Sequence, residues 1–264
     1  HAQFFAAAAL SMGVTAAAAN DVVDMSNSTH GYVTVNYSSS ARLKVGIQYN
    51  GGKTVFYDCP SGKDASFSLD SNGKYTVTLY RNVSGTSYQQ VESKSMNVTV
   101  KDKHRRILVS TSEVQFSKGD TVSAKAAELC KNAKTDEAKV IAIYNYMASR
   151  YTYDNKLANE ITSGKIIKYI PDTAATLKVP PVSATIFSLF AAMCRSQGIP
   201  CALTKGYAGS SYHAWNKVNL NGKWYQIDLT YAVTRSVKNA KTLHDCVSPL
   251  TYTNTSDALA VAAA

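Results

Sequence analysis

The chain has 264 residues and a formal net charge of +10, with 45% hydrophobic and 10% aromatic residues. This composition excludes a mainly disordered chain and supplies enough apolar material for one large core or two smaller ones. No run of about 18 apolar residues occurs, which excludes a polytopic membrane protein.

Residues 1–20 are rich in alanine and contain Phe4, Phe5 and Leu10. This segment resembles the apolar region and small-residue cleavage site of a secretory signal peptide. We therefore expect an exported protein, secreted or held at the cell surface, with an artificial extension as the alternative origin of the segment. The alanine-rich tail at 258–264 is expected to fray.

Residues 21–103 have the pattern of short strands separated by turns. Alternating apolar residues predict strands at 32–37, 43–49, 54–57, 67–69, 75–80 and 96–100. Asn50-Gly51-Gly52 predicts a hairpin turn between the second and third of these strands. The spacing indicates a small all-β sandwich domain. No motif in it carries chemistry, so its default role is that of a spacer or binding module.

Residues 104–264 mix helices and strands after a charged linker at 101–106. Three helices are predicted: one at 121–132, one that begins after the capping residue Thr135, and one at 184–197. Gly198 is expected to end the third helix. Residues 155–182 are interrupted by Gly and Pro and are predicted to be rich in loops. Strands are predicted at 201–207, 212–220 and 223–231, with Asn221-Gly222 as the turn between the last two.

The register of this last hairpin brings a histidine and an aspartate together. If Leu220 faces Lys223, then alternation places His213, Trp215, Asp228 and Thr230 on one polar face. An apolar face lies opposite. His213 and Asp228 become diagonal neighbours, and a carboxylate beside an imidazole orients the ring. Such a pair serves nucleophilic catalysis, and the alternative is an incidental polar pair on a solvated surface.

Residues 140–231 resemble the transglutaminase-like family of papain-like thiol enzymes, in its exported bacterial type. The matching segments are Tyr-Thr-Tyr-Asp at 151–154, Ala-Ala-Met-Cys-Arg-Ser-Gln-Gly-Ile-Pro at 191–200, Gly-Tyr-Ala-Gly at 206–209, Tyr-His-Ala-Trp at 212–215 and Lys-Trp-Tyr-Gln-Ile-Asp at 223–228. The resemblance implies an α+β domain with papain-like architecture over residues 104–264. It also implies catalytic roles for His213 and Asp228.

The nucleophile of this family does not match. The family pattern places a cysteine fifteen residues before the Gly of Gly-Ile-Pro, and that position is Ser183. Pro181 also replaces the family's glycine. A helix N-terminus and a nearby imidazolium stabilise a thiolate but cannot appreciably ionise a serine hydroxyl. Serine is in turn a good N-cap, which is the alternative role of Ser183. Cys194 and Cys201 lie elsewhere in the pattern and are expected in the core.

Two functional hypotheses follow. The first is a transglutaminase-like protein with a degenerate, catalytically impaired site, which acts as a binding or cell-surface interaction module. The alternative is an active acyl-transfer enzyme or amide hydrolase that uses Ser183, His213 and Asp228. Tyr153, Trp215 and Trp224 are candidates for lining a binding cleft, and shielding of the His–Asp pair is the alternative role of the tryptophans.

The expected partners follow from charge and cysteine pattern. The chain has five cysteines but no C-x-x-C motif, so we expect no metal site and no cofactor. A protein or peptide ligand is expected. Residues 104–264 carry +8 of the net charge, which admits an anionic cell-wall polymer as a partner, with a solvated basic surface as the alternative. No nucleic-acid partner is expected.

Overall fold

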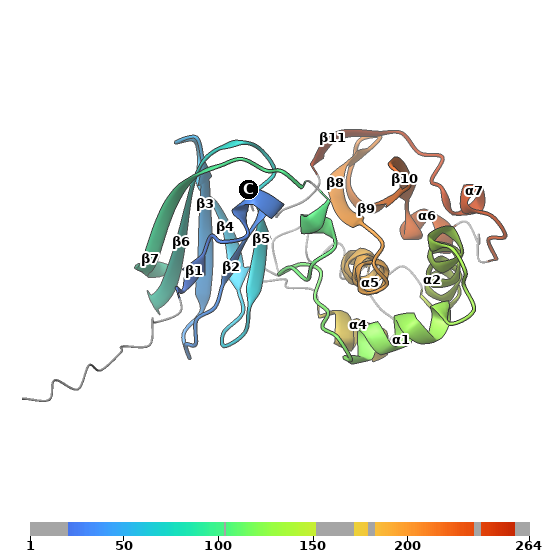
Figure 1. Ribbon diagram of the computed structural model, residues 1–264, viewed down its shortest axis with the longest axis horizontal. Helices are drawn as coiled ribbons and strands as arrows, with labels where there is room; N and C mark the ends of the chain where they lie inside the picture. Colours follow the sequence, from blue (N-terminus) through green and yellow to red (C-terminus); the bar gives the residue numbers. More distant parts are fainter. Residues whose placement is uncertain (1–20, 103, 152–171, 179–182, 235–238, 257–264) are drawn as a thin grey trace, which may run out of the picture.

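The computed structural model describes residues 21–102, 104–151, 172–178, 183–234 and 239–256. The predictions for the leader, for Tyr153 and for the alanine-rich tail lie outside these residues. Figure 1 shows a β-rich part, which holds β1 to β7, beside a mixed part, which holds the α-helices and β8 to β11. Each part has its own buried cluster of apolar side chains, one ending at Val100 and the other beginning at Val114.

The β-rich part consists of two antiparallel sheets that share one core. Its strands are β1 (Val23–Asp24), β2 (Tyr32–Val35), β3 (Leu43–Tyr49), β4 (Val55–Cys59), β5 (Ala65–Ser68), β6 (Gly73–Ser84) and β7 (Ser87–Val98), and a short 3-10 helix η1 spans Ser28–His30. The sheet orders are β1-β2-β5 and β4-β3-β6-β7. Both sheets contribute fully buried residues to the cluster, among them Val33, Phe67 and Val77. The apolar residues that alternate along these strands therefore contribute to one shared core.

The local sequence predicted the turns of this part better than the strand lengths. Asn50 and Gly51 both have positive φ, as a type I′ hairpin turn requires, and they connect β3 to β4. The predicted strands at 75–80 and 96–100 were too short, since β6 and β7 form one long hairpin. The added residues are mostly polar and exposed, so they gave no apolar alternation to read.

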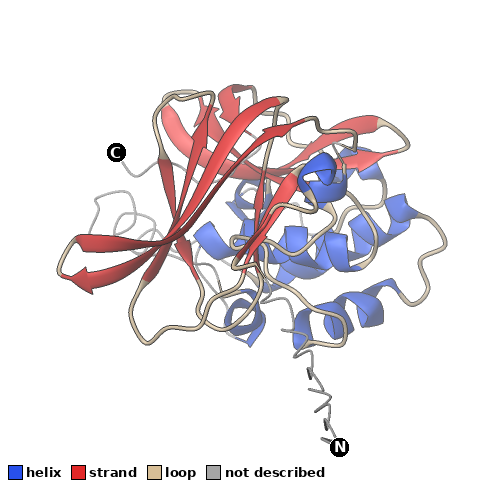
Figure 2. Ribbon diagram, turned by 60° about the vertical axis from the view of Figure 1, so that its left-hand side comes forward, coloured by secondary structure: helices blue, strands red, loops and turns tan. Residues whose placement is uncertain are grey.

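The mixed part packs its helices against a four-stranded antiparallel sheet, as Figure 2 shows. The helices are η2 (Arg105–Ile107), α1 (Thr121–Cys130), α2 (Asp136–Arg150), α4 (Thr173–Lys178), α5 (Ser183–Ser196), α6 (Leu229–Thr234) and α7 (Leu243–Cys246). The strands are β8 (Cys201–Ala208), β9 (Ser211–Leu220), β10 (Lys223–Ile227) and β11 (Tyr252–Ser256), in the order β10-β9-β8-β11. Helix α4 lies within residues 155–182, which were predicted to be rich in loops, and most of the other residues of this segment lie outside the described ones.

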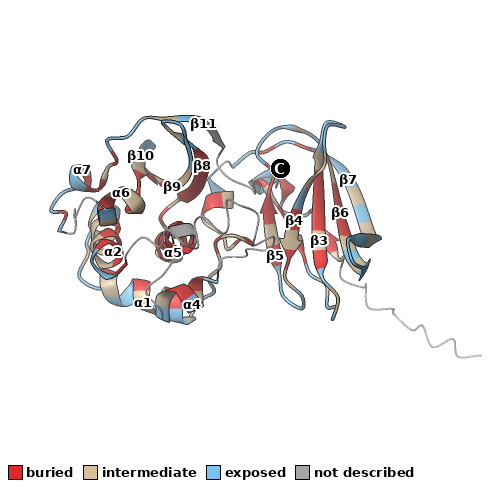
Figure 3. Ribbon diagram, turned by 180° about the vertical axis from the view of Figure 1, so that it is seen from behind, coloured by how far each residue is buried: buried red, intermediate tan, exposed pale blue. Residues whose placement is uncertain are grey.

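Helix α5 is the centre of this core. Residues 189 to 194 of the helix are fully buried, and Figure 3 shows α5 surrounded by the other helices and the sheet. The predicted end of the helix is confirmed, because Gly198 takes a positive φ and the N–H of Ile199 bonds to the carbonyl of Cys194. The predicted cap of α2 is also confirmed, since the Thr135 side chain accepts a hydrogen bond from the Ala138 N–H.

The β9–β10 hairpin has the predicted register. Leu220 pairs with Lys223, and Asn216 pairs with Ile227. The predicted second strand was too long, because β10 ends at Ile227 and residues 229–234 form α6. Thr230 therefore does not face His213 across the sheet.

The two parts are connected by contacts of the segment between them. Arg106 pairs with Asp70 at 3.1 Å, and the Ser112 N–H donates to the Ser66 carbonyl on the edge of β5. On the other side, buried Arg195 donates to the carbonyl of Val109 at 2.9 Å. In the described part of the chain, no helix has the length and apolarity that crossing a membrane requires.

Candidate functional site

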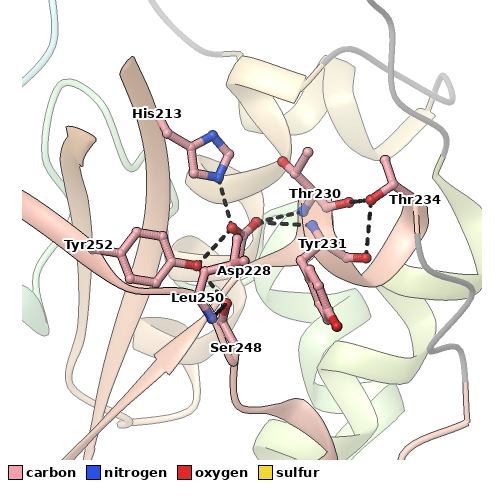
Figure 4. Close-up of polar contacts among 8 residues, drawn as sticks. All are labelled: His213, Asp228, Thr230, Tyr231, Thr234, Ser248, Leu250 and Tyr252. Carbon is pink, nitrogen blue, oxygen red and sulfur yellow. Dashed lines mark hydrogen bonds and ion pairs between the residues drawn. The ribbon is translucent and has the colours of Figure 1, made fainter. Parts of the chain in front are cut away.

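The site is built around a direct contact between His213 and Asp228. His213 lies in β9, and Asp228 directly follows the last residue of β10. The His213 Nε2 atom lies 2.8 Å from Asp228 Oδ2. The His213 side chain is 18% exposed, whereas that of Asp228 is 1% exposed. The structure therefore brings together the two residues that the hairpin register placed on one face, in the arrangement that orients an imidazole (Figure 4).

Asp228 has a second, structural role that the sequence reading missed. Its Oδ1 atom accepts hydrogen bonds from the backbone N–H groups of Thr230 and Tyr231, at 2.9 and 3.2 Å. These bonds cap the start of α6, and the Asp228 carbonyl accepts the first helical bond from Ala232. An aspartate directly before a helical segment is the signal that would have predicted this helix. The carboxylate is thus fixed by the backbone on one oxygen while the other faces His213.

Two further site residues come from the C-terminal end of the described chain. Tyr252 Oη donates to Asp228 Oδ2 at 2.8 Å, and Ser248 Oγ lies 2.6 Å from Tyr252 Oη. Ser248 is held by its N–H, which donates to the carbonyl of Gln226, and Tyr252 pairs with Ala208 of β8. Apart from the contact between Ser248 and Tyr252, these contacts join residues more than 20 positions apart, so no local pattern indicates them.

The N-terminal end of α5 approaches His213 from the other side. The rings of Phe187 and His213 meet edge to face at a centroid distance of 5.8 Å, and the Phe187 carbonyl accepts from Asn216 Nδ2 of β9. The backbone at Ser183, the first residue of α5, lies one helical turn before Phe187 on the same face. Position 183 is therefore at the helix end that lies nearest the imidazole.

The two tryptophans occupy different environments. Trp215 is fully buried, and its ring stacks on Tyr252 at a centroid distance of 4.0 Å and nearly parallel to His213 at 6.2 Å. Trp215 therefore lies beside His213, as the side-chain alternation predicts, and it is covered by Tyr252. Trp224 is 42% exposed and contacts His104 edge to face.

The five cysteines all lie in buried positions, and none forms a disulfide. Cys194 and Cys201 are fully buried in the core of the mixed part, as expected. Burial raises the pKa of Cys59 and of Cys246 to about 12 and holds the pKa of Cys194 well above its ordinary value. A buried thiol with a raised pKa is a poor nucleophile.

Within the described residues, no group of three or more His, Cys, Asp or Glu side chains is placed to hold a metal ion.

The arrangement at His213 is suited to the transfer of a proton. The imidazole, oriented by a carboxylate and in contact with Phe187 in the first half of α5, can accept a proton from a nucleophile and return it to a leaving group.

Comparison with known proteins agrees with this arrangement. Residues 123–229 match the model of the transglutaminase-like superfamily. The chain is 28% identical to the kyphoscoliosis peptidase of Mus musculus over 134 residues and 29% identical to that of Homo sapiens over 117 residues. These matches cover 46% and 40% of this chain but only 19% and 17% of the relatives, so the chain spans about a fifth of their length.

Two solved structures are more distant. A candidate cysteine protease from Cytophaga hutchinsonii shares 14% identity, with a TM-score of 0.44 and coverage of 86% of this chain and 77% of its own. A TGase shares 22% identity, with a TM-score of 0.36 and coverage of 62% and 44%. The family model, and not these likenesses, marks the site region: residues 123–229 are similar to the transglutaminase-like superfamily.

Proposed function

We propose that this protein is a transglutaminase-like binding module whose site has lost the family's thiol. The observation that carries the proposal is the combination of an intact His213–Asp228 pair with five cysteines that are all buried. Position 183, at the start of α5, holds a serine. The site therefore retains the proton-moving half of the apparatus without the nucleophile that the family uses.

The physical cost of this replacement is large. A thiol at a helix N-terminus and beside an imidazolium ionises near neutral pH, whereas a serine hydroxyl does not. A ligand of the site, a protein or peptide segment in this proposal, is then held without rapid acyl transfer.

The β-rich part serves as a sandwich-type accessory domain in this proposal. Residues 1–20 direct the protein to the cell surface. An anionic polymer at the surface is a second partner of the basic mixed part.

A second candidate is an active serine enzyme. The observation in its favour is the orientation of His213. The imidazole bonds to Asp228 through Nε2, so Nδ1 is the ring nitrogen that would accept a proton from a nucleophile. Ser183 Oγ would attack an amide or ester carbonyl, and His213 would take its proton and pass it to the leaving amine or alcohol.

One experiment separates the two candidates. The purified full chain is incubated with a fluorescent amine and a glutamine-containing protein, and separately with peptide and ester substrates. Impaired catalysis predicts rates that are the same for the wild type and Ser183→Ala. A wild-type activity that disappears in Ser183→Ala, together with a phosphonate adduct on Ser183 in mass spectrometry, would establish the serine enzyme instead.

A further inference from the structure

Asp228 Oδ2 is an oxygen shared by two donors. His213 Nε2 and Tyr252 Oη both lie 2.8 Å from it, while Oδ1 is occupied by the backbone at the start of α6 (Figure 4). The backbone bonds therefore fix the carboxylate whether or not Tyr252 is present. What Tyr252 adds is a second hydrogen bond on the oxygen that faces the imidazole.

Tyr252 is well placed to remain a donor. Burial and the charge of Asp228 raise the pKa of Tyr252, so the phenol keeps its proton. Because its hydrogen points to Asp228, the 2.6 Å contact with Ser248 requires the serine hydroxyl to donate to Tyr252 Oη. The Leu250 N–H donates in turn to Ser248 Oγ. Each bond in such a chain polarises the next one and strengthens the final bond to Asp228.

The ring of Tyr252 is fixed separately from its hydroxyl. It stacks on the fully buried Trp215, and it lies within 7° of the His213 ring plane. Replacement by phenylalanine would keep this stack and the strand pairing of β11 with β8, and would remove only the hydroxyl. The two contributions of Tyr252 are therefore separable by experiment.

From this geometry we infer that Tyr252 is a positioning residue that weakens the hold of Asp228 on the His213 proton by sharing Oδ2. The inference deepens the proposed function and rests on it, since it takes the His213–Asp228 pair as the working centre. Tyr252 lies outside the segment that matches the family model.

The first test does not depend on catalysis. In the wild-type background, Tyr252→Phe should move the NMR resonance of the His213 Nε2 proton downfield, because that proton no longer shares its acceptor. Ser248→Ala should move it in the same direction by less. The matched control is Tyr151→Phe, which removes another buried hydroxyl, one that donates to the Thr176 carbonyl of α4, and should leave the resonance in place.

The second test uses reactivity in a Ser183→Cys background. A stronger His213–Asp228 bond favours the imidazolium and hence the thiolate, so Tyr252→Phe should raise the rate of iodoacetamide labelling at residue 183 about three- to tenfold. A merely structural role predicts a lower rate. An unchanged resonance, or an unchanged or lower rate, overturns the inference. Absence of any labelling in Ser183→Cys itself would count against the proposed function, while the resonance would still decide the role of Tyr252.

Discussion

Removal of the Asp228 carboxylate should be among the most destabilising substitutions in the mixed part. The side chain is 1% exposed and accepts four hydrogen bonds: two from the backbone at the start of α6, one from His213 and one from Tyr252. In Asp228→Ala, the loss of the cap alone costs about 1 kcal/mol. The loss of the buried contacts to the carboxylate raises the total to about 3–5 kcal/mol.

Asp228→Asn should cost less, because the remaining amide oxygen still caps α6. The amide nitrogen then faces two donors, but the Tyr252 hydroxyl can turn toward Ser248 Oγ, 2.6 Å away. We expect a loss of about 1–2 kcal/mol for this variant. The order of stability should be wild type, Asp228→Asn, Asp228→Ala.

The assay is urea unfolding followed by tryptophan fluorescence. Both tryptophans, Trp215 and Trp224, lie in the mixed part, so the signal reports this part. The matched control is Asp120→Ala, since Asp120 caps α1 through Ser123 N–H and has no contact with the site. That variant should lose about 1 kcal/mol. A loss in Asp228→Ala no greater than in Asp120→Ala would refute the reasoning, because Asp228 would then act only as a cap.

Three further predictions concern the buried thiols, alkaline pH and the α2 contact. In the absence of reductant, an aromatic disulfide reagent should label all five cysteines in the unfolded chain and none rapidly in the native protein, since all are free and buried; one rapidly labelled native thiol would contradict this. Because burial raises the pKa of Cys59 and Cys246 to about 12, their stabilising contribution is complete below the ordinary thiol pKa and declines as the pH rises from there toward 12. The urea concentration at the unfolding midpoint should therefore decrease as the pH is raised from 8 to 11. A midpoint that stays constant over this range would argue against buried thiols. Asn145→Ala should cost about 1–3 kcal/mol of unfolding free energy, because both polar atoms of the Asn145 side chain bond to the backbone of Ala240; a change under about 0.5 kcal/mol would contradict that contact.

The sequence predicted those features of the site that depend on local rules. Asn221 and Gly222 both take the positive φ that a type I′ turn requires, and this turn fixes the register that brings β9 against β10. Once the register is fixed, side-chain alternation leaves His213 on the face toward which Asp228 emerges. The helix ending at Gly198 was predictable for the same reason, since glycine takes the left-handed conformation there without strain.

The remaining features depend on contacts that no local pattern encodes. Strand β11 is short and polar, and it reaches the site only because it pairs with β8, more than forty residues earlier. Tyr252 therefore gave no signal as a partner of Asp228. The burial of Trp215 has the same origin, since the ring that covers it belongs to Tyr252.

The central claim is that the mixed part keeps working proton-transfer machinery and lacks only its thiol. Ser183→Cys tests it most directly, with amine incorporation into a glutamine-containing protein as the measurement and Ser183→Cys/His213→Ala as the control. The account predicts that Ser183→Cys gains activity over the wild type and that the double variant loses this gain. A Ser183→Cys protein that is folded but no more active than the wild type would contradict the claim.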